Sequence, residues 1–222
     1  MSWSDFSDWW LGEIADDPTY KTVVTPLLLD ILNPVAGASY VDLGSGEGNV
    51  MREVQSTGAV VLGVEVSESL AMLTPGRTVV AELPQIPMGT DSLDGAFAVL
   101  VLEHLLDHVS FFTETARVVR SEGVLALVIN HPIWTAPDST PITDTDGEVL
   151  WRPGKYFSTG KTEVPAGEVT VTFHHRPMAS LLNVAAEAGW SLEQMIETPP
   201  NHELEGQAGI PRLLACRWRL LP

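Results

Sequence analysis

The glycine-rich stretch at residues 44–48 constrains the fold of this chain more than any other part of its sequence. It reads Gly-Ser-Gly-Glu-Gly and follows a mainly apolar run at residues 40–43, which is typical of the end of a β-strand. Residues 50–54 then begin a helical pattern. Glycine adopts positive φ and allows a backbone to approach a ligand closely, and a helix N-terminus presents backbone N–H groups. This order of strand, turn and helix predicts an α/β fold with a ligand at the carboxyl ends of the strands.

The spacing of the glycines and one acidic residue narrow the choice of ligand. In the dinucleotide-binding fingerprint, Gly-x-Gly-x-x-Gly, the third glycine would fall at Asn49, but here it comes one position earlier, at Gly48. Asp42 lies two positions before Gly44. An NAD-type turn needs no carboxylate at that place, whereas a cofactor that carries an amino group does. Another nucleotide-binding site, and a glycine turn that binds nothing, remain alternatives at this point.

These residues resemble the first motif of the class I S-adenosylmethionine-dependent methyltransferases, an acid followed by a small turn with Gly-x-Gly-x-Gly. Further similarity, to the ubiquinone/menaquinone-methylase-like group of small-molecule methyltransferases, lies in Glu103-His104, His175-Arg176-Pro177 and Gly189-Trp190. The resemblance runs from about Val41 to the C-terminus. It implies S-adenosylmethionine as the cofactor and S-adenosylhomocysteine as the product.

Apolar runs predict the remaining strands of the sheet. Continuous apolar runs are typical of parallel strands that are covered on both faces. We expect such strands at residues 60–65, 78–81, 92–101, 124–130, 190–196 and 213–220. The expected fold is therefore α/β and Rossmann-like, with a seven-stranded, mostly parallel sheet and helices on both faces. The family resemblance implies that the last two strands form an antiparallel pair.

We expect a single methyltransferase domain over residues 1–222, in four parts. These parts are an N-terminal helical cap at 1–36, a cofactor-binding half at 37–130, an inserted substrate or lid segment at 131–175, and a C-terminal helix and strand pair at 176–222.

Packing is the favoured role of the aromatic residues in the N-terminal cap. The alternative is a lid, in which an amphipathic cap ahead of the first strand covers the carboxyl edge of the sheet and Tyr20 is the best candidate to reach the cofactor. Within the insert, residues 169–175 alternate like a half-buried strand. We expect that strand to pair with residues 148–151 in a hairpin over the site.

Glu65 is the second acid that suggests cofactor binding. It ends the second strand, 21 residues after Gly44, where a carboxylate can accept hydrogen bonds from ribose hydroxyls. That spacing suits NAD equally well, and a carboxylate favoured by the helix macrodipole is the structural alternative. The family implies contacts of Glu82 and Leu83 with the adenine ring. The predicted cofactor-binding set is Asp42, Gly44, Ser45, Gly46, Gly48, Glu65, Val66, Glu82, Leu83, Ala98 and Val99.

Three histidines are candidate catalytic residues, because each follows a predicted strand at the cofactor edge or precedes a helix there. They are His104, His131 and His175. Histidine suits proton transfer near neutral pH. Adjacent strand residues face opposite ways, so His174 and His175 cannot both enter one pocket, and the family resemblance selects His175. Packing or helix capping by each histidine, with catalysis by alignment alone, stays an alternative.

The sequence also gives an expectation for the walls of the acceptor pocket and for a metal site. Trp134 and Trp151, in the insert, are expected to wall the pocket. No two histidines are spaced four apart with an acid in the metalloprotease manner, so we expect no metal site.

Composition limits the partners. The net charge of −17, from 12 basic and 29 acidic residues, disfavours nucleic-acid backbones and anionic membranes. Cys216 is the only cysteine, there is no basic segment before an apolar stretch at the N-terminus, and no apolar run approaches the ~20 residues of a membrane span. We therefore expect a cytoplasmic protein with a small-molecule acceptor and neither a nucleic-acid nor a membrane partner. The oligomeric state stays open.

The predicted function is methyl transfer from S-adenosylmethionine to a small molecule. Two other functions fit the same scaffold: an NAD(P)-dependent oxidoreductase, and a non-catalytic protein that binds S-adenosylmethionine. The glycine spacing and Asp42 count against the oxidoreductase, and the histidines and aromatic insert count mildly against a non-catalytic protein.

Overall fold

A seven-stranded sheet forms the centre of the molecule. The structure is a computed structural model, and it describes residues 6–14, 17–74, 76–166, 169–199 and 209–222. The strand order is β10-β11-β5-β4-β1-β2-β3. The strands are β1 (Ser39–Leu43), β2 (Val60–Glu65), β3 (Thr78–Val80), β4 (Leu93–Val99), β5 (Val119–Asn130), β10 (Trp190–Thr198) and β11 (Leu213–Leu220).

The five strands from β1 to β5 run parallel, while β11 runs antiparallel to both β5 and β10. The predicted mostly parallel sheet and its antiparallel final pair are therefore confirmed.

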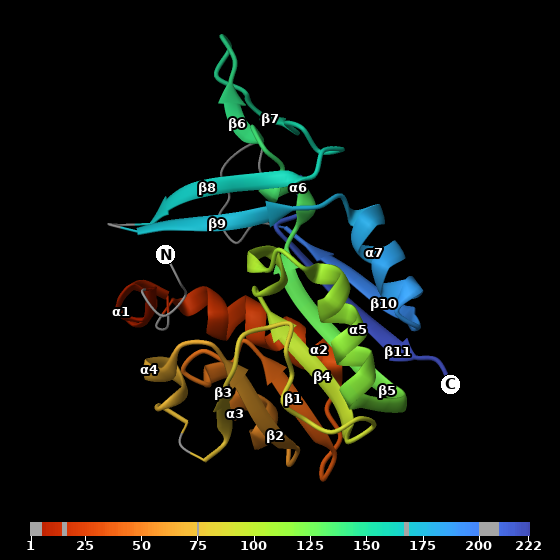
Figure 1. Cartoon of the computed structure of the whole chain (residues 1–222). Helices are drawn as coiled ribbons and strands as arrows, with labels where there is room; N and C mark the ends of the chain where they lie inside the picture. Colours follow the sequence, from red (N-terminus) through yellow and green to blue (C-terminus); the bar gives the residue numbers. More distant parts are fainter. Residues whose placement is uncertain (1–5, 15–16, 75, 167–168, 200–208) are drawn as a thin grey trace.

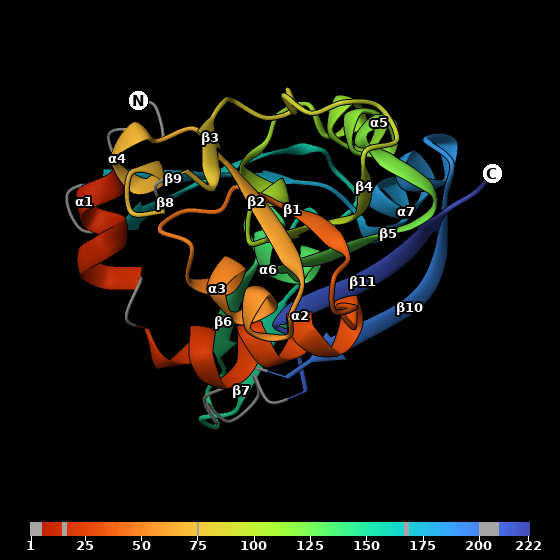
Figure 2. The ribbon, with the colours of Figure 1, turned by 90° about the horizontal axis from the view of Figure 1, so that it is seen from below.

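Helices cover both faces of the sheet, as expected (Figure 2). On one face lie α2 (Thr25–Leu32) and α3 (Asn49–Ser56), and on the other lie α5 (His108–Val118) and α7 (Met178–Glu187). A short helix, α4 (Glu68–Ala71), follows β2. Because successive strand residues point to opposite faces, β4 sends Phe97 into the core beside α2 and Ala98 into the core beside α5.

The chain ahead of β1 is helical over its described residues. It comprises α1 (Ser7–Trp9), the π-helical turns η2 (Trp10–Ile14) and η3 (Tyr20–Val24), and α2. Trp3, in the expected N-terminal cap, lies outside the described residues. The C-terminal end of α2 is tied to the sheet, because the Arg217 guanidinium on β11 donates to the Ile31 and Leu32 carbonyls.

The segment between β5 and α7 contains two hairpins. One pairs β6 (Thr140–Thr143) with β7 (Val149–Arg152), and the other pairs β8 (Gly160–Ala166) with β9 (Val169–His175). The predicted pairing of 148–151 with 169–175 was wrong. Only Gly167-Glu168 separates Ala166 from Val169 in the sequence, and a two-residue connection beginning with glycine favours a tight hairpin.

The β8–β9 hairpin lies across the edge of the sheet and above the N-terminal helices (Figure 1). Two short helical segments that follow strands of the sheet contact β9 of this hairpin. They are η4 (Leu102–His104), after β4, and α6 (Pro132–Thr135), after β5. Across the described part of the chain, no helix has the length and apolar character needed to cross a bilayer.

Candidate active site

A cavity of about 490 Å³ opens at the carboxyl ends of β1, β2 and β4. The glycine turn forms one side of it, and the η4 segment, β9 and the N-terminal helices form the other. Of the predicted cofactor residues, Asp42, Gly44, Ser45, Gly46, Glu65, Val66, Glu82, Leu83 and Val99 line this cavity. The structure thus brings together side chains from four separate strand ends.

The turn after β1 is held by hydrogen bonds to β2. Gly44 and Ser45 donate their amides to the Val64 carbonyl, at 2.8 and 3.1 Å, and Gly46 donates to Glu65 Oε2 at 2.9 Å. Gly46 has a φ of +53°, and a Cβ added there would have Trp10 Nε1, at 3.6 Å, as its nearest neighbour. Among the three glycines of the turn, Gly46 therefore has the most open backbone on the side where a Cβ would lie.

Two predicted cofactor residues lie away from the cavity lining. A Cβ added at Gly48, whose φ is +81°, would come within 2.3 Å of Thr74 Cγ2, so this glycine serves close packing at the start of α3. Ala98 is 1% exposed and belongs to the core on the α5 side, whereas the next residue, Val99, lines the cavity.

Buried carboxylates dominate the side of the cavity formed by the turn. Asp42 is 2% exposed, and its Oδ2 atom has no hydrogen-bond partner among the described residues. Burial, reinforced by Glu65 and Glu47, raises the pKa of Asp42 well above its usual value. The Ser45 hydroxyl is likewise buried without a described partner. Unpartnered buried polar atoms are costly, so this pair indicates a place for a polar ligand.

Glu65 has a structural role that the sequence did not reveal. Its two carboxylate oxygens accept the amides of Ser67, at 2.8 Å, and Gly46, at 2.9 Å. Burial raises the pKa of Glu65, and these backbone hydrogen bonds oppose the shift. The carboxylate that was predicted to bind ribose therefore also fixes the glycine turn and the start of α4.

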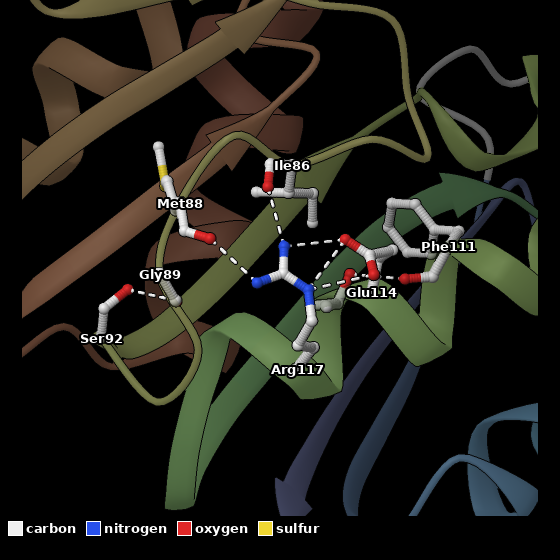
Figure 3. Close-up of polar contacts among 8 residues, drawn as sticks. Ile86, Met88, Gly89, Ser92, Phe111, Glu114 and Arg117 are labelled. Carbon is white, nitrogen blue, oxygen red and sulfur yellow. Dashed lines mark hydrogen bonds and ion pairs between the residues drawn. The ribbon is translucent and has the colours of Figure 1, made fainter.

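The segment that carries Glu82 and Leu83 is anchored from α5. The Arg117 guanidinium donates to the Ile86 and Met88 carbonyls, each at 2.9 Å, and forms an ion pair with Glu114 at 2.8 Å (Figure 3). This contact holds the chain that follows β3 against α5, so the cavity wall at Glu82 and Leu83 has a fixed backbone.

Two imidazoles lie on the opposite wall. His104 follows β4, and its Nδ1 lies 2.9 Å from the Thr172 carbonyl. A carbonyl oxygen can only accept, so Nδ1 of His104 is the donor in this contact. His174, on β9, also lines the cavity. Burial, and then the Arg176 and His104 charges, lower the pKa of His174.

Arg176 joins the two elements that carry these histidines. Its buried guanidinium donates to the carbonyls of Leu102, at 3.1 Å, Leu106, at 3.0 Å, and His174, at 3.3 Å, and also to that of Leu105. Burial lowers the pKa of Arg176 to about 10. One side chain thus ties β9 to the η4 segment and sets the shape of this wall.

The other predicted catalytic histidines do not line the cavity. His175 is 1% exposed, with Nδ1 3.0 Å from Thr135 Oγ1 and Nε2 2.8 Å from the Tyr156 carbonyl. His131 is 5% exposed, and its Nε2 lies 2.8 Å from Glu197 Oε1. Both rings have both nitrogens engaged by the protein, since His131 Nδ1 also accepts the Ile133 amide at 3.2 Å.

The family resemblance selected His175, and not His174, as the residue that enters the pocket. In the structure His174 lines the cavity and His175 does not. Strand alternation separates the two residues without telling which one is inward. Trp134 and Trp151 also differ from expectation, because their rings pack on each other at 4.3 Å and neither lines the cavity.

The N-terminal helices contribute two aromatic residues to the wall. Tyr20 lines the cavity, as the lid alternative predicts, and Trp10 joins it, with the two ring centroids 5.9 Å apart. The Trp10 indole donates to the Glu47 carboxylate in the glycine turn. Sequence reasoning missed Trp10 and Glu47, although Glu47 lies inside the Gly-x-Gly-x-Gly motif. Within the described ranges, no group of three or more His, Cys, Asp or Glu side chains is arranged to hold a metal.

Comparison with known proteins identifies the same region. Residues 41–127 match the family model of the methyltransferase domain. The chain is 26% identical to an S-adenosylmethionine-dependent methyltransferase from Mesorhizobium loti, whose crystal structure it matches with a TM-score of 0.78 over 87% of this chain and 96% of that chain.

Curated relatives include two O-methyltransferases. The O-methyltransferase cnsE of Penicillium expansum is 29% identical over 166 residues, which cover 68% of this chain and 57% of that protein. The ubiquinone biosynthesis O-methyltransferase of Thiobacillus denitrificans is 29% identical over 128 residues, 52% of this chain and 54% of that protein. The chain spans between 39% and 57% of the lengths of the curated relatives it matches. The sheet topology and these similarities agree, and residues 41–127 form a methyltransferase domain of the kind found in class I S-adenosylmethionine-dependent methyltransferases.

Proposed function

We propose that this chain transfers a methyl group from S-adenosylmethionine to a hydroxyl group of a small-molecule acceptor. The observation that carries the proposal is the unpartnered Asp42 Oδ2, which lies in the same cavity as the glycine turn and faces a wall with two imidazoles. The two O-methyltransferases among the relatives support oxygen as the receiving atom.

The described residues fit the cofactor. Asp42 Oδ2 and Ser45 Oγ are buried and have no hydrogen-bond partner among the residues that the structure describes, and the cofactor's amino group and other polar groups would satisfy them. Gly46 leaves its backbone open on the cavity side. Glu65 would accept ribose hydroxyls, and Glu82 would accept the adenine amino group. When bound, the cofactor supplies a methyl group on a positively charged sulfur, which is a strong electrophile.

The protein's part is mainly alignment and proton handling. Holding an acceptor at a fixed distance and angle can lower a barrier by up to about 7–11 kcal/mol. His104 or His174 would orient the acceptor hydroxyl and take its proton. The bound cofactor would supply the methyl group to the acceptor oxygen and would leave as S-adenosylhomocysteine. A general base of this kind adds roughly 10²–10⁴-fold.

Two other functions are compatible with the same scaffold. The glycine spacing and the family match disfavour an NAD(P)-dependent oxidoreductase. A protein that binds S-adenosylmethionine without transfer would share the Asp42 side of the cavity and would have no need of the histidine pair. Cys216 is buried, and burial raises the pKa of its thiol to about 12, so this thiol is not a reactive nucleophile near neutral pH.

The test is transfer from a labelled methyl donor. Purified protein is incubated with S-adenosylmethionine bearing a deuterated methyl group and a cellular metabolite extract, and products are sought by mass spectrometry. The proposal expects at least one metabolite that gains a labelled methyl in place of hydrogen. The Gly46→Val variant is the control, because a branched residue resists positive φ and fills ligand space. Saturable cofactor binding with no labelled metabolite from any extract would favour the non-catalytic rival.

A further inference from the structure

We infer that the methyl acceptor is a small molecule without net negative charge, held between His104 and His174. The inference rests on the proposed function and names its substrate class. Its basis is the charge of the cavity lining, which contains five carboxylates and, in the part of the chain that the structure describes, neither lysine nor arginine. The five are Asp42, Glu47, Glu65, Glu82 and Asp107.

The lack of a cation in the lining does not depend on the undescribed residues. All 12 lysines and arginines of the chain lie in the described ranges, because residues 1–5, 15–16, 75, 167–168 and 200–208 contain neither type. Several basic side chains near these walls have other partners. Lys161, the cross-strand neighbour of His174, pairs with Glu163 at 2.7 Å. Arg52 donates to the Glu47 carbonyl, Arg176 to main-chain carbonyls of η4 and β9, and Arg212 to Asn130, with its guanidinium 5.0 Å from the Trp134 ring centre.

The acceptor wall offers hydrogen bonds but no lysine or arginine. Its polar side chains are His104, His174 and the Asp107 carboxylate, and its remaining surface includes leucines and an aromatic ring, among them Leu105, Leu106 and Tyr20. The lowered pKa of His174 keeps that imidazole neutral near neutral pH, so the wall gains no cation there. A hydroxyl can donate to or accept from a neutral imidazole, and the rest of an uncharged molecule can pack on the apolar surface.

An anionic acceptor has no counterpart in this cavity. The cofactor carries one net positive charge, which the carboxylates on the glycine side already outnumber. A carboxylate or phosphate group in the acceptor would be buried without a cation and would face like charges. An uncharged or cationic acceptor avoids both costs. The charge of the lining therefore acts as a specificity filter that is separate from the shape of the cavity.

The test separates acceptors by charge before the reaction. A metabolite extract is divided at pH 7.5 by ion exchange into anionic, neutral and cationic pools, and each pool receives the protein and deuterium-labelled S-adenosylmethionine. The neutral and cationic pools together should yield roughly tenfold more labelled product than the anionic pool, as expected for unit charges a few ångströms apart. Product arising mainly from the anionic pool overturns the inference and leaves the proposed function intact. An absence of product in all three pools contradicts the proposed function, and the inference falls with it.

A charge-insertion variant tests the cause of the selectivity. Leu106 lines the cavity and is 77% exposed, so Leu106→Lys can add a cation at the rim without burying it. This variant should raise the yield from the anionic pool severalfold over wild type, while Leu106→Gln, of similar size and no charge, should not. Equal yields from the two variants would overturn the claim that a missing cation excludes anionic acceptors.

Discussion

The Glu65 carboxylate accepts the Gly46 amide at 2.9 Å, which joins the acid at the end of β2 to the most open glycine of the turn after β1. The second carboxylate oxygen accepts the Ser67 amide at the start of α4. The residue proposed to bind ribose therefore also fixes the glycine turn and the start of α4. Cofactor affinity and loop geometry should respond together when Glu65 changes.

Glu65→Ala should weaken S-adenosylhomocysteine binding by about 1.5–3 kcal/mol, the usual worth of a hydrogen bond to a charged group. It should also lower the free energy of unfolding, because the Gly46 and Ser67 amides lose their acceptor. Titration calorimetry and chemical denaturation measure the two effects. Glu53→Ala, an exposed acid on α3, is the control. Equal losses of affinity in the two variants would remove the special role of Glu65.

Asp42 predicts a pH dependence of cofactor binding. Burial raises the pKa of Asp42 well above 3.8 in the folded protein, so the free protein holds a proton there that the unfolded chain has already lost. An ammonium group of the ligand favours the ionised carboxylate and lowers that pKa. Binding therefore releases a proton, and S-adenosylhomocysteine affinity should rise as pH increases from 3.8 through the raised pKa. Calorimetry in buffers of different ionisation enthalpy detects the release.

The matched variant for that experiment is Asp42→Asn, which keeps the shape and removes the titration. It should bind S-adenosylhomocysteine about tenfold or more weakly at neutral pH, the lower end expected for loss of a charge-assisted hydrogen bond. Its affinity should be flatter across the same pH range. A wild-type protein whose affinity falls with rising pH in this range contradicts the assignment of Asp42 to the amino group.

Two of the three glycines in the turn, Gly46 and Gly48, should respond differently to substitution by alanine. Gly46→Ala should keep the protein folded, at a cost of about 1–2 kcal/mol for the left-handed backbone, and should reduce S-adenosylhomocysteine affinity. Gly48→Ala should cost more stability, because its Cβ would come within 2.3 Å of Thr74 Cγ2. Thermal unfolding ranks the two. A Gly48→Ala protein as stable as Gly46→Ala would show that the packing at Thr74 relaxes freely.

The histidines divide into two groups by position. Once an acceptor is known, His104→Ala or His174→Ala should lower the transfer rate by ~10² or more, as expected for loss of a general base. His175→Gln should instead lower the free energy of unfolding, by about 1–3 kcal/mol, because it breaks a buried contact with Thr135. Single-turnover rates and denaturation curves separate these effects. Near-wild-type rates in both cavity variants would mean that catalysis here is alignment alone.

The parallel part of the sheet could be predicted from the sequence because its strands are apolar runs, and β1 and β4 are buried on both faces. The apolar run at 60–65 coincides with β2 as observed. By contrast β5 begins at Val119, before the predicted 124–130, because the exposed residues 120–122 also belong to the strand. Glu122 has a φ of +64°, and the β4–β5 register shifts in the same region. A bulge of this kind leaves no apolar signal in the sequence.

The substrate side of the site was less predictable for a physical reason. Alternation shows that His174 and His175 face opposite ways, but which side is the interior depends on the strand's partner. That partner is β8, and not residues 148–151 as expected. Trp10 and Glu47 are 37 residues apart in the sequence, so no local sequence pattern predicts their contact. The cofactor side was easier because its residues follow consecutive strands, whose carboxyl ends meet at one edge.

We propose that this cavity binds S-adenosylmethionine through Asp42 and the glycine turn. The most direct measurement is calorimetric titration of the wild-type protein and Asp42→Asn with S-adenosylhomocysteine, and of the wild type with NADH. The predicted result is saturable binding of S-adenosylhomocysteine by the wild type, about tenfold or more weaker binding by Asp42→Asn, and no binding of NADH. A wild-type protein that binds NADH and gives no heat with S-adenosylhomocysteine would contradict it.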